Sequence, residues 1–81
     1  NEARTPETQK LVDDALKQLE ILEKDYQKLA DDLSTSGEDK RVIYAMIANF
    51  QARIDLLNTV LEKIESIKKL NTLKNYEDAL L

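Results

Sequence analysis

Apolar and aromatic side chains recur at alternating steps of three and four residues along two segments of this 81-residue chain. The first row is Val12, Ala15, Leu19, Leu22, Tyr26, Leu29 and Leu33. The second row, after a short Ser/Thr/Gly break, is Ile43, Ile47, Phe50, Ile54, Leu57, Leu61 and Ile64. This spacing places each row along one face of an α-helix. Two such helices joined by a short loop predict an antiparallel two-helix hairpin in which the rows pack together.

A start signal for the first helix lies near the beginning of the chain. Thr5 is a suitable N-cap, Pro6 suits the first helical position, and Glu7 puts an acid in the first turn. We therefore expect the first helix over about residues 6–33, after a frayed end at residues 1–4.

The break between the two rows is short and polar. Residues 34–36 form the predicted loop, and the second helix is expected over about residues 37–70. Ser36 followed three residues later by Asp39 resembles a capping box with aspartate in place of the usual glutamate. A connection of this length makes the two helices antiparallel neighbours.

The tail over residues 71–81 admits three structures. We favour a frayed extension of the second helix with a turn at Asn71, because asparagine tolerates the backbone conformation that ends helices. A short third helix after Thr72 and a mobile tail are the alternatives.

Composition supports an all-α fold in a single domain over residues 1–81. The chain has one glycine and one proline, so its long Lys/Glu/Leu/Ala-rich stretches have high helix propensity. A chain of this size buries only about 60% of its unfolded surface, and small folds add disulfides, a metal or self-association. Cysteine and histidine are both absent, which removes disulfides and the usual zinc ligand sets. Regular helix packing and self-association remain.

The second helix carries more apolar surface than one neighbouring helix covers. A second row, offset by one position, widens its apolar face: Met46, Phe50, Leu57, Val60, Ile64 and Ile67. Leu11, Leu16, Ile21 and Ala30 lie beside the main row of the first helix. The simplest way to cover both excesses is a homodimer of hairpins that forms a four-helix bundle.

The offset row supplies the predicted interface, together with one cation inside it. The interface residues are Met46, Phe50, Arg53, Leu57, Val60, Ile64 and Ile67. We expect Arg53 to lay its aliphatic stem along the row with its charged end in solvent. An ion pair across the interface with an acid of the first helix is the alternative.

Catalytic, metal and cofactor sites are not expected, and the chain is predicted not to be an enzyme. Three acidic pairs are the candidates for acid–base chemistry: Asp13 with Asp14, Asp31 with Asp32, and Glu20 with Glu23. Adjacent acids on a helix point about 100° apart, and Glu20 and Glu23 share a solvated face, so no pair forms a dry site. The net charge of −4 argues against nucleic acid, and no apolar run is long enough for direct membrane insertion.

Residues 38–67 contain a motif of the form D-x-R-V-I-x-A-M-I-x-N-[FY]-x-x-[KR]-[IL]-x-[IL]-L. Its matching residues are Asp39, Arg41, Val42, Ile43, Ala45, Met46, Ile47, Asn49, Phe50, Arg53, Ile54, Leu56 and Leu57. With this motif, residues 38–67 resemble a region that follows a long charged helix in bacterial membrane-anchored anti-sigma-factor-like proteins. The resemblance implies an extramembrane helical region beyond a transmembrane anchor of a longer parent, on the extracytoplasmic side. This chain contains neither the anchor nor a sigma-binding region.

We therefore predict a non-enzymatic oligomerisation and protein-interaction module within a larger membrane-anchored signalling protein. The alternative is a stand-alone small regulator or chaperone that binds a helix of another protein on the wide apolar face of the second helix.

Overall fold

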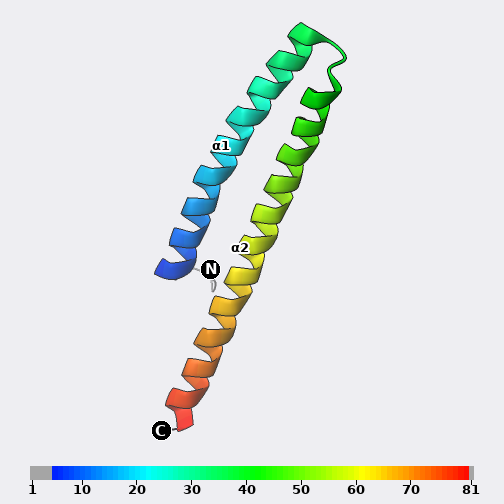
Figure 1. The fold of residues 1–81 in the computed structure, drawn as a ribbon. Helices are drawn as coiled ribbons and strands as arrows, with labels where there is room; N and C mark the ends of the chain where they lie inside the picture. Colours follow the sequence, from blue (N-terminus) through cyan, green and yellow to red (C-terminus); the bar gives the residue numbers. More distant parts are fainter. Residues whose placement is uncertain (1–4, 81) are drawn as a thin grey trace.

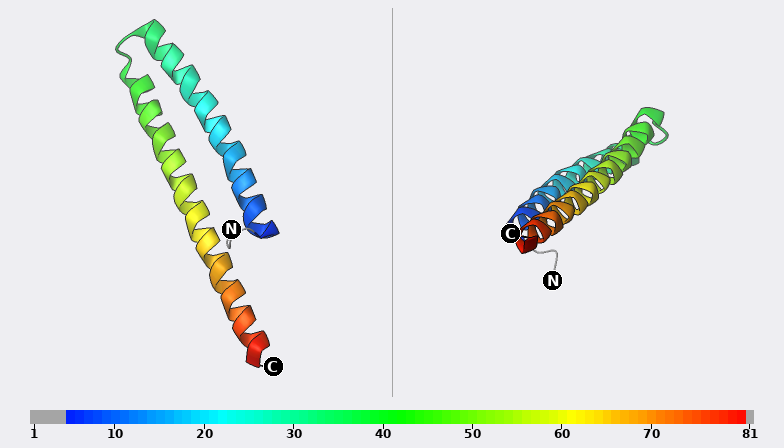
Figure 2. Two further views of the ribbon diagram at one scale, coloured as in Figure 1. Left: turned by 180° about the vertical axis from the view of Figure 1, so that it is seen from behind. Right: turned by 90° about the horizontal axis from the view of Figure 1, so that it is seen from below.

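Two long α-helices run antiparallel and side by side in the computed structural model, which describes residues 5–80 (Figures 1 and 2). Helix α1 spans Pro6–Ser36 and helix α2 spans Lys40–Leu80. The predicted all-α hairpin is confirmed. The frayed end expected at residues 1–4, and Leu81, lie outside the described residues.

The N-terminus of α1 is capped as its sequence predicts. The hydroxyl of Thr5 accepts a hydrogen bond from the Thr8 backbone N–H at 3.2 Å, and the Thr8 hydroxyl accepts one from the Thr5 N–H at 2.9 Å. This is a reciprocal capping box with threonine at its third helical position. Pro6 occupies the first turn, so the predicted start at residue 6 is confirmed.

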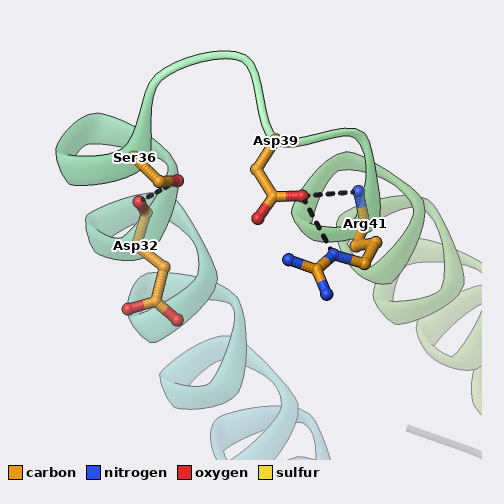
Figure 3. Close-up of polar contacts among 4 residues, drawn as sticks. All are labelled: Asp32, Ser36, Asp39 and Arg41. Carbon is orange, nitrogen blue, oxygen red and sulfur yellow. Dashed lines mark hydrogen bonds and ion pairs between the residues drawn. The ribbon is translucent and has the colours of Figure 1, made fainter.

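Helix α1 continues through the predicted loop as far as Ser36. The hydroxyls of Ser34 and Thr35 donate to the Asp31 carbonyl, and the Ser36 hydroxyl donates to the Asp32 carbonyl at 2.8 Å (Figure 3). These bonds occupy carbonyls near the helix end, so the run of hydroxyls does not interrupt the helix. The predicted end at residue 33 is therefore wrong by one turn.

Gly37 ends α1 instead of beginning α2. Its φ is 77°, which glycine adopts without the strain that a side chain would add, and its N–H donates to the Leu33 carbonyl at 2.8 Å. The next helix starts after Asp39, whose Oδ1 accepts from the Arg41 N–H at 2.9 Å (Figure 3). The capping box predicted between Ser36 and Asp39 is wrong, because Ser36 belongs to the last turn of α1.

Asp39 also contacts the side chain of Arg41. The Arg41 Nε lies 3.5 Å from Asp39 Oδ1. The hydrogen bond from the Arg41 backbone, followed by the contact with its guanidinium, lowers the pKa of Asp39 below its ordinary value.

Helix α2 is the longer element and extends beyond the N-terminus of α1 (Figures 1 and 2). It remains helical to Leu80, so the turn predicted at Asn71 is wrong. Thr72 stays in the helix and donates its hydroxyl to the Lys68 carbonyl at 2.9 Å. Every described residue from 68 onwards is exposed. The last turns of α2 therefore form an unaccompanied helical extension.

The two helices pack along the row predicted for α1 but along a different row of α2. Every member of the α1 row from Val12 to Leu33 is buried or half-buried. Within residues 5–80 only α1 can cover α2, so the covered residues of α2 mark its α1-facing side. They are Val42, Ala45, Met46, Asn49, Arg53, Leu56, Val60, Ile64 and Ile67. Of the row assigned to the hairpin core, only Ile64 lies on this side.

Candidate interaction surface

Helix α2 carries an unbroken row of exposed apolar side chains, here named the α2 stripe. Its members are Ile43, Ile47, Phe50, Ile54, Leu57 and Leu61. Each exposes between 43% and 58% of its surface. The steps along the stripe are four, three, four, three and four residues, which is the heptad spacing of a coiled-coil contact row. The stripe therefore has the spacing of a helix-packing surface, and the hairpin leaves it uncovered.

The stripe lies beside the α1-facing side of α2. One residue turns an α-helix by about 100°, so the positions of the stripe centre about 100° away from the α1-facing residues. A shallow groove marks the opposite flank of the hairpin, lined by Leu11, Asp14 and Gln18 of α1 and Thr59 and Lys63 of α2. The stripe and the groove thus occupy opposite faces of the two-helix layer.

Helix α1 adds apolar surface on the same face as the stripe. By the same helical period, Leu16 and Ala30 lie on the flank of α1 that points away from the groove. Leu16 exposes 57% of its surface, and Ala30 is half-buried. Ile21 is also exposed, but its position lies on the groove side of α1.

A polar contact fixes the rotation of α2 against α1. The Asn49 side chain, 8% exposed, donates from Nδ2 to the Leu22 carbonyl at 2.9 Å. Arg53, one turn later, donates from Nη2 to the same carbonyl at 3.3 Å. These are long-range hydrogen bonds from α2 to the backbone of α1, so they place residues 49–53 level with Leu22.

Two aromatic rings cover the guanidinium of Arg53. Its central carbon lies 5.3 Å from the centre of the Tyr26 ring and 5.4 Å from that of Phe50, within cation–π range. The two rings are tilted by 56° with centres 5.0 Å apart, which is a favourable aromatic pair. Phe50 is therefore a member of the α2 stripe that also contacts Tyr26 and Arg53 between the two helices.

The polar contact is incompletely satisfied. Asn49 Oδ1 and Arg53 Nε are both buried and have no hydrogen-bond partner. Among the described residues, each ion pair is local: Lys10 with Asp14, Lys24 with Glu20, and Arg41 with Asp39. The charge of Arg53 therefore has no carboxylate partner within residues 5–80.

The structure divides the seven predicted interface residues between two surfaces. Phe50 and Leu57 belong to the exposed α2 stripe. The other five are half-buried on the α1-facing side: Met46, Arg53, Val60, Ile64 and Ile67. The expected solvent-directed end of Arg53 is also wrong, because Nη2 bonds to the backbone of α1. No ion pair with an acid of α1 replaces it within the described chain.

The sequence held a signal for the correct row. If the spacing of the stripe is continued along α2, the positions after Ile64 are the polar residues Lys68 and Asn71. The α1-facing row instead continues to the apolar Ile67. Ile67 lies where it can face the first turn of α1, since it lines a shared hollow with Thr5 and Thr8. The row of α2 that packs against α1 along its whole length therefore includes Ile67.

Other site chemistries find no support in the described part of the chain. Within residues 5–80, no three side chains of the metal-ligating types gather closely enough to hold a metal ion. No described helix is long and apolar enough to cross a membrane. The acidic pairs considered above are all exposed.

Comparisons with models of protein families, with curated proteins and with solved structures found no match.

Proposed function

We propose that this chain is a non-enzymatic helical interaction module whose docking surface is the α2 stripe. The carrying observation is the stripe's unbroken heptad spacing in side chains that remain about half exposed. Contiguous apolar surfaces of this kind are typical of protein–protein contacts, whereas isolated exposed apolar residues need no explanation. Heptad spacing further specifies that the docked element is a helix.

The energy available from the stripe supports docking. Full burial of a large apolar side chain contributes about 1.5–3 kcal/mol, so covering the exposed half of each member contributes roughly 1 kcal/mol. For six members the gross gain is several kcal/mol, comparable with the total stability of a small domain. A two-helix layer with so little enclosed core gains proportionately more from a partner than a larger fold does.

The resemblance of residues 38–67 to anti-sigma-factor-like proteins supports a place in a larger membrane-anchored regulatory protein. In such a parent, the module would join chains or receive a helix from another component. The resemblance rests on Asp39, Arg41 and a set of apolar positions. Some of these apolar positions, such as Ile43 and Ile54, are members of the α2 stripe.

A labelled synthetic amphipathic helix with leucine at every heptad contact position tests this proposal. We expect the chain either to bind this probe, by fluorescence anisotropy, or to self-associate, by sedimentation equilibrium. The double variant Ile54→Glu/Leu57→Glu should lose both properties and keep its helix content. Ile21→Glu is the matched control, because Ile21 is similarly exposed on the opposite face.

Retained binding in the double variant would contradict the assignment of the surface. A wild-type chain that neither binds the probe nor self-associates at concentrations of hundreds of micromolar would refute the proposed function.

A further inference from the structure

Resting on the proposed function, we infer that the helix covering the α2 stripe is the α2 stripe of a second copy, packed antiparallel. The twofold axis lies level with residues 51–53 and relates two hairpins in a four-helix bundle. The interface predicted from sequence used the offset row, whereas this one uses the stripe that the hairpin leaves exposed.

The spacing of the stripe is the same in both chain directions. An antiparallel copy centred at residue 52 therefore brings every member opposite another member. The resulting contacts are Ile43 with Leu61, Ile47 with Leu57, and Phe50 with Ile54, each formed twice. In heptad terms each contact joins an a position to a d position, which is the pairing of antiparallel coiled coils. No stripe residue is left without an apolar counterpart.

The geometry of the hairpin closes a bundle around this axis. On α2, the directions of α1 and of the stripe differ by about 100°, close to the right angle between neighbours in a square bundle. A twofold axis perpendicular to α2 keeps α1 and its copy on the same side of the α2 pair. The two α1 helices then face each other through the flank that carries Leu16 and Ala30. One symmetry operation covers the stripe together with Leu16 and Ala30 of α1.

Charges near the axis are compatible with this arrangement. The positions that follow Ile43, Phe50 and Leu57 flank the contact directly, and they carry the uncharged residues Tyr44, Gln51 and Asn58. The acids Asp55 and Glu62 lie farther around α2, so two copies meet at this edge without like-charge repulsion. Contacts with the Leu22 carbonyl place Arg53 close to the level of the axis. Glu23, the next residue of α1, lies on the flank that faces the other copy. Two Glu23 carboxylates and two Arg53 guanidiniums then lie near the axis, and Glu20 on the same flank is paired with Lys24 of its own helix.

A parallel dimer fits the chain less well. Continued along the same spacing, the contact positions after Ile64 are Lys68, Asn71, Asn75 and Asp78. A parallel copy would place Lys68 against Lys68 and Asp78 against Asp78, which is unfavourable. It would also put the two α1 helices on opposite sides of the α2 pair and leave Leu16 in solvent. The antiparallel pair avoids both consequences.

The area is adequate for a stable dimer. Six half-exposed large side chains per copy offer on the order of 100 Å² each, so the two stripes bury roughly 1,200 Å², the lower end of specific interfaces. Leu16 and Ala30 of both copies add to this area.

Sedimentation equilibrium of the full chain tests the self-pairing. We expect a dimer at low micromolar concentration, at least a hundredfold weaker self-association in Ile54→Glu, and an unchanged dimer in Ile21→Glu. Equal masses for wild type and Ile54→Glu at all concentrations would overturn the inference. If the wild type is monomeric but binds the synthetic probe helix through the stripe, the second copy is the wrong partner and the docking function stands.

Cysteine cross-linking tests the direction, because the chain has no cysteine of its own. Ile47→Cys mixed with Leu57→Cys should give a disulfide-linked heterodimer under mild oxidation, since these positions face each other only in the antiparallel pair. Each variant alone should remain largely uncross-linked. Efficient cross-linking of Ile47→Cys or Leu57→Cys alone, without the mixed product, would show a parallel pair and refute the antiparallel assignment.

Discussion

Replacing Asn49 with leucine is expected to stabilise the folded hairpin by about 1–3 kcal/mol. The change removes the Nδ2 hydrogen bond to the Leu22 carbonyl, a net loss of about 0.5–1.5 kcal/mol. It also removes the buried Oδ1, which has no partner and whose desolvation costs about 1–3 kcal/mol. Leucine has a similar branched shape and adds apolar burial at a site that is only 8% exposed. The two gains outweigh the lost bond.

Thermal unfolding followed by far-ultraviolet circular dichroism measures this effect. For a domain of this size, 1 kcal/mol corresponds to about 4–8 °C in the midpoint, so a clear upward shift is expected. The comparison must use equal protein concentrations, because any dimerisation adds to the apparent stability. Asn75→Leu is the matched control, since Asn75 is exposed on the α2 extension and should change the midpoint little.

An unchanged or lowered midpoint in Asn49→Leu would refute the reasoning. It would mean that the hydrogen bond to Leu22 contributes more than the buried Oδ1 costs, or that the site cannot hold a leucine. If the prediction holds, the wild-type asparagine is destabilising, and its physical benefit is specificity. Its amide reaches the Leu22 carbonyl in only one alignment of the two helices, as buried asparagines fix register in coiled coils.

Three further perturbations test other parts of the structure. Gly37→Ala should lower stability by about 1–2 kcal/mol through the positive φ alone, because its Cβ would meet no atom within 4 Å, and thermal melting against Ser36→Ala measures it. Val60→Asp should unfold the hairpin, at a loss of about 2–4 kcal/mol in urea denaturation, whereas Ile54→Asp should preserve helix content in the dilute chain. The lowered pKa of Asp39 contributes stability that is present above its ordinary pKa of about 4 and is lost as the pH falls through the lowered value. Asp39→Asn should therefore reduce the loss of stability on acidification, seen as a flatter plot of melting midpoint against pH.

The start of α1 could be predicted because its determinants are local. Thr5, Pro6 and the row beginning at Val12 lie within three turns of one another, and local hydrogen bonds satisfy the first turn. The break near Gly37 was also visible in the sequence, but its details were not. Hydroxyl side chains support a loop or a helix end equally well, and the choice depended on which carbonyls they reach.

The extension of α2 beyond residue 70 was expected, but the turn expected at Asn71 was wrong for a related reason. Asparagine is common at helix ends, but it ends a helix only where a non-helical backbone conformation has the lower free energy. Here the surrounding Lys, Leu and Glu residues favour helix, and the helical Thr72 adds a bond to the Lys68 carbonyl.

The sequence by itself determined the two helices, their antiparallel connection and the excess of apolar surface on α2. These follow from periodicity and short-range capping, which act within a few residues. The rotation of α2 about its axis was decided only in the tertiary structure. Asn49 and Arg53 are polar but face α1, because both donate hydrogen bonds to the Leu22 carbonyl. The guanidinium of Arg53 also packs against the rings of Tyr26 and Phe50. That rotation turned the more regular apolar row outward and left it exposed as the α2 stripe.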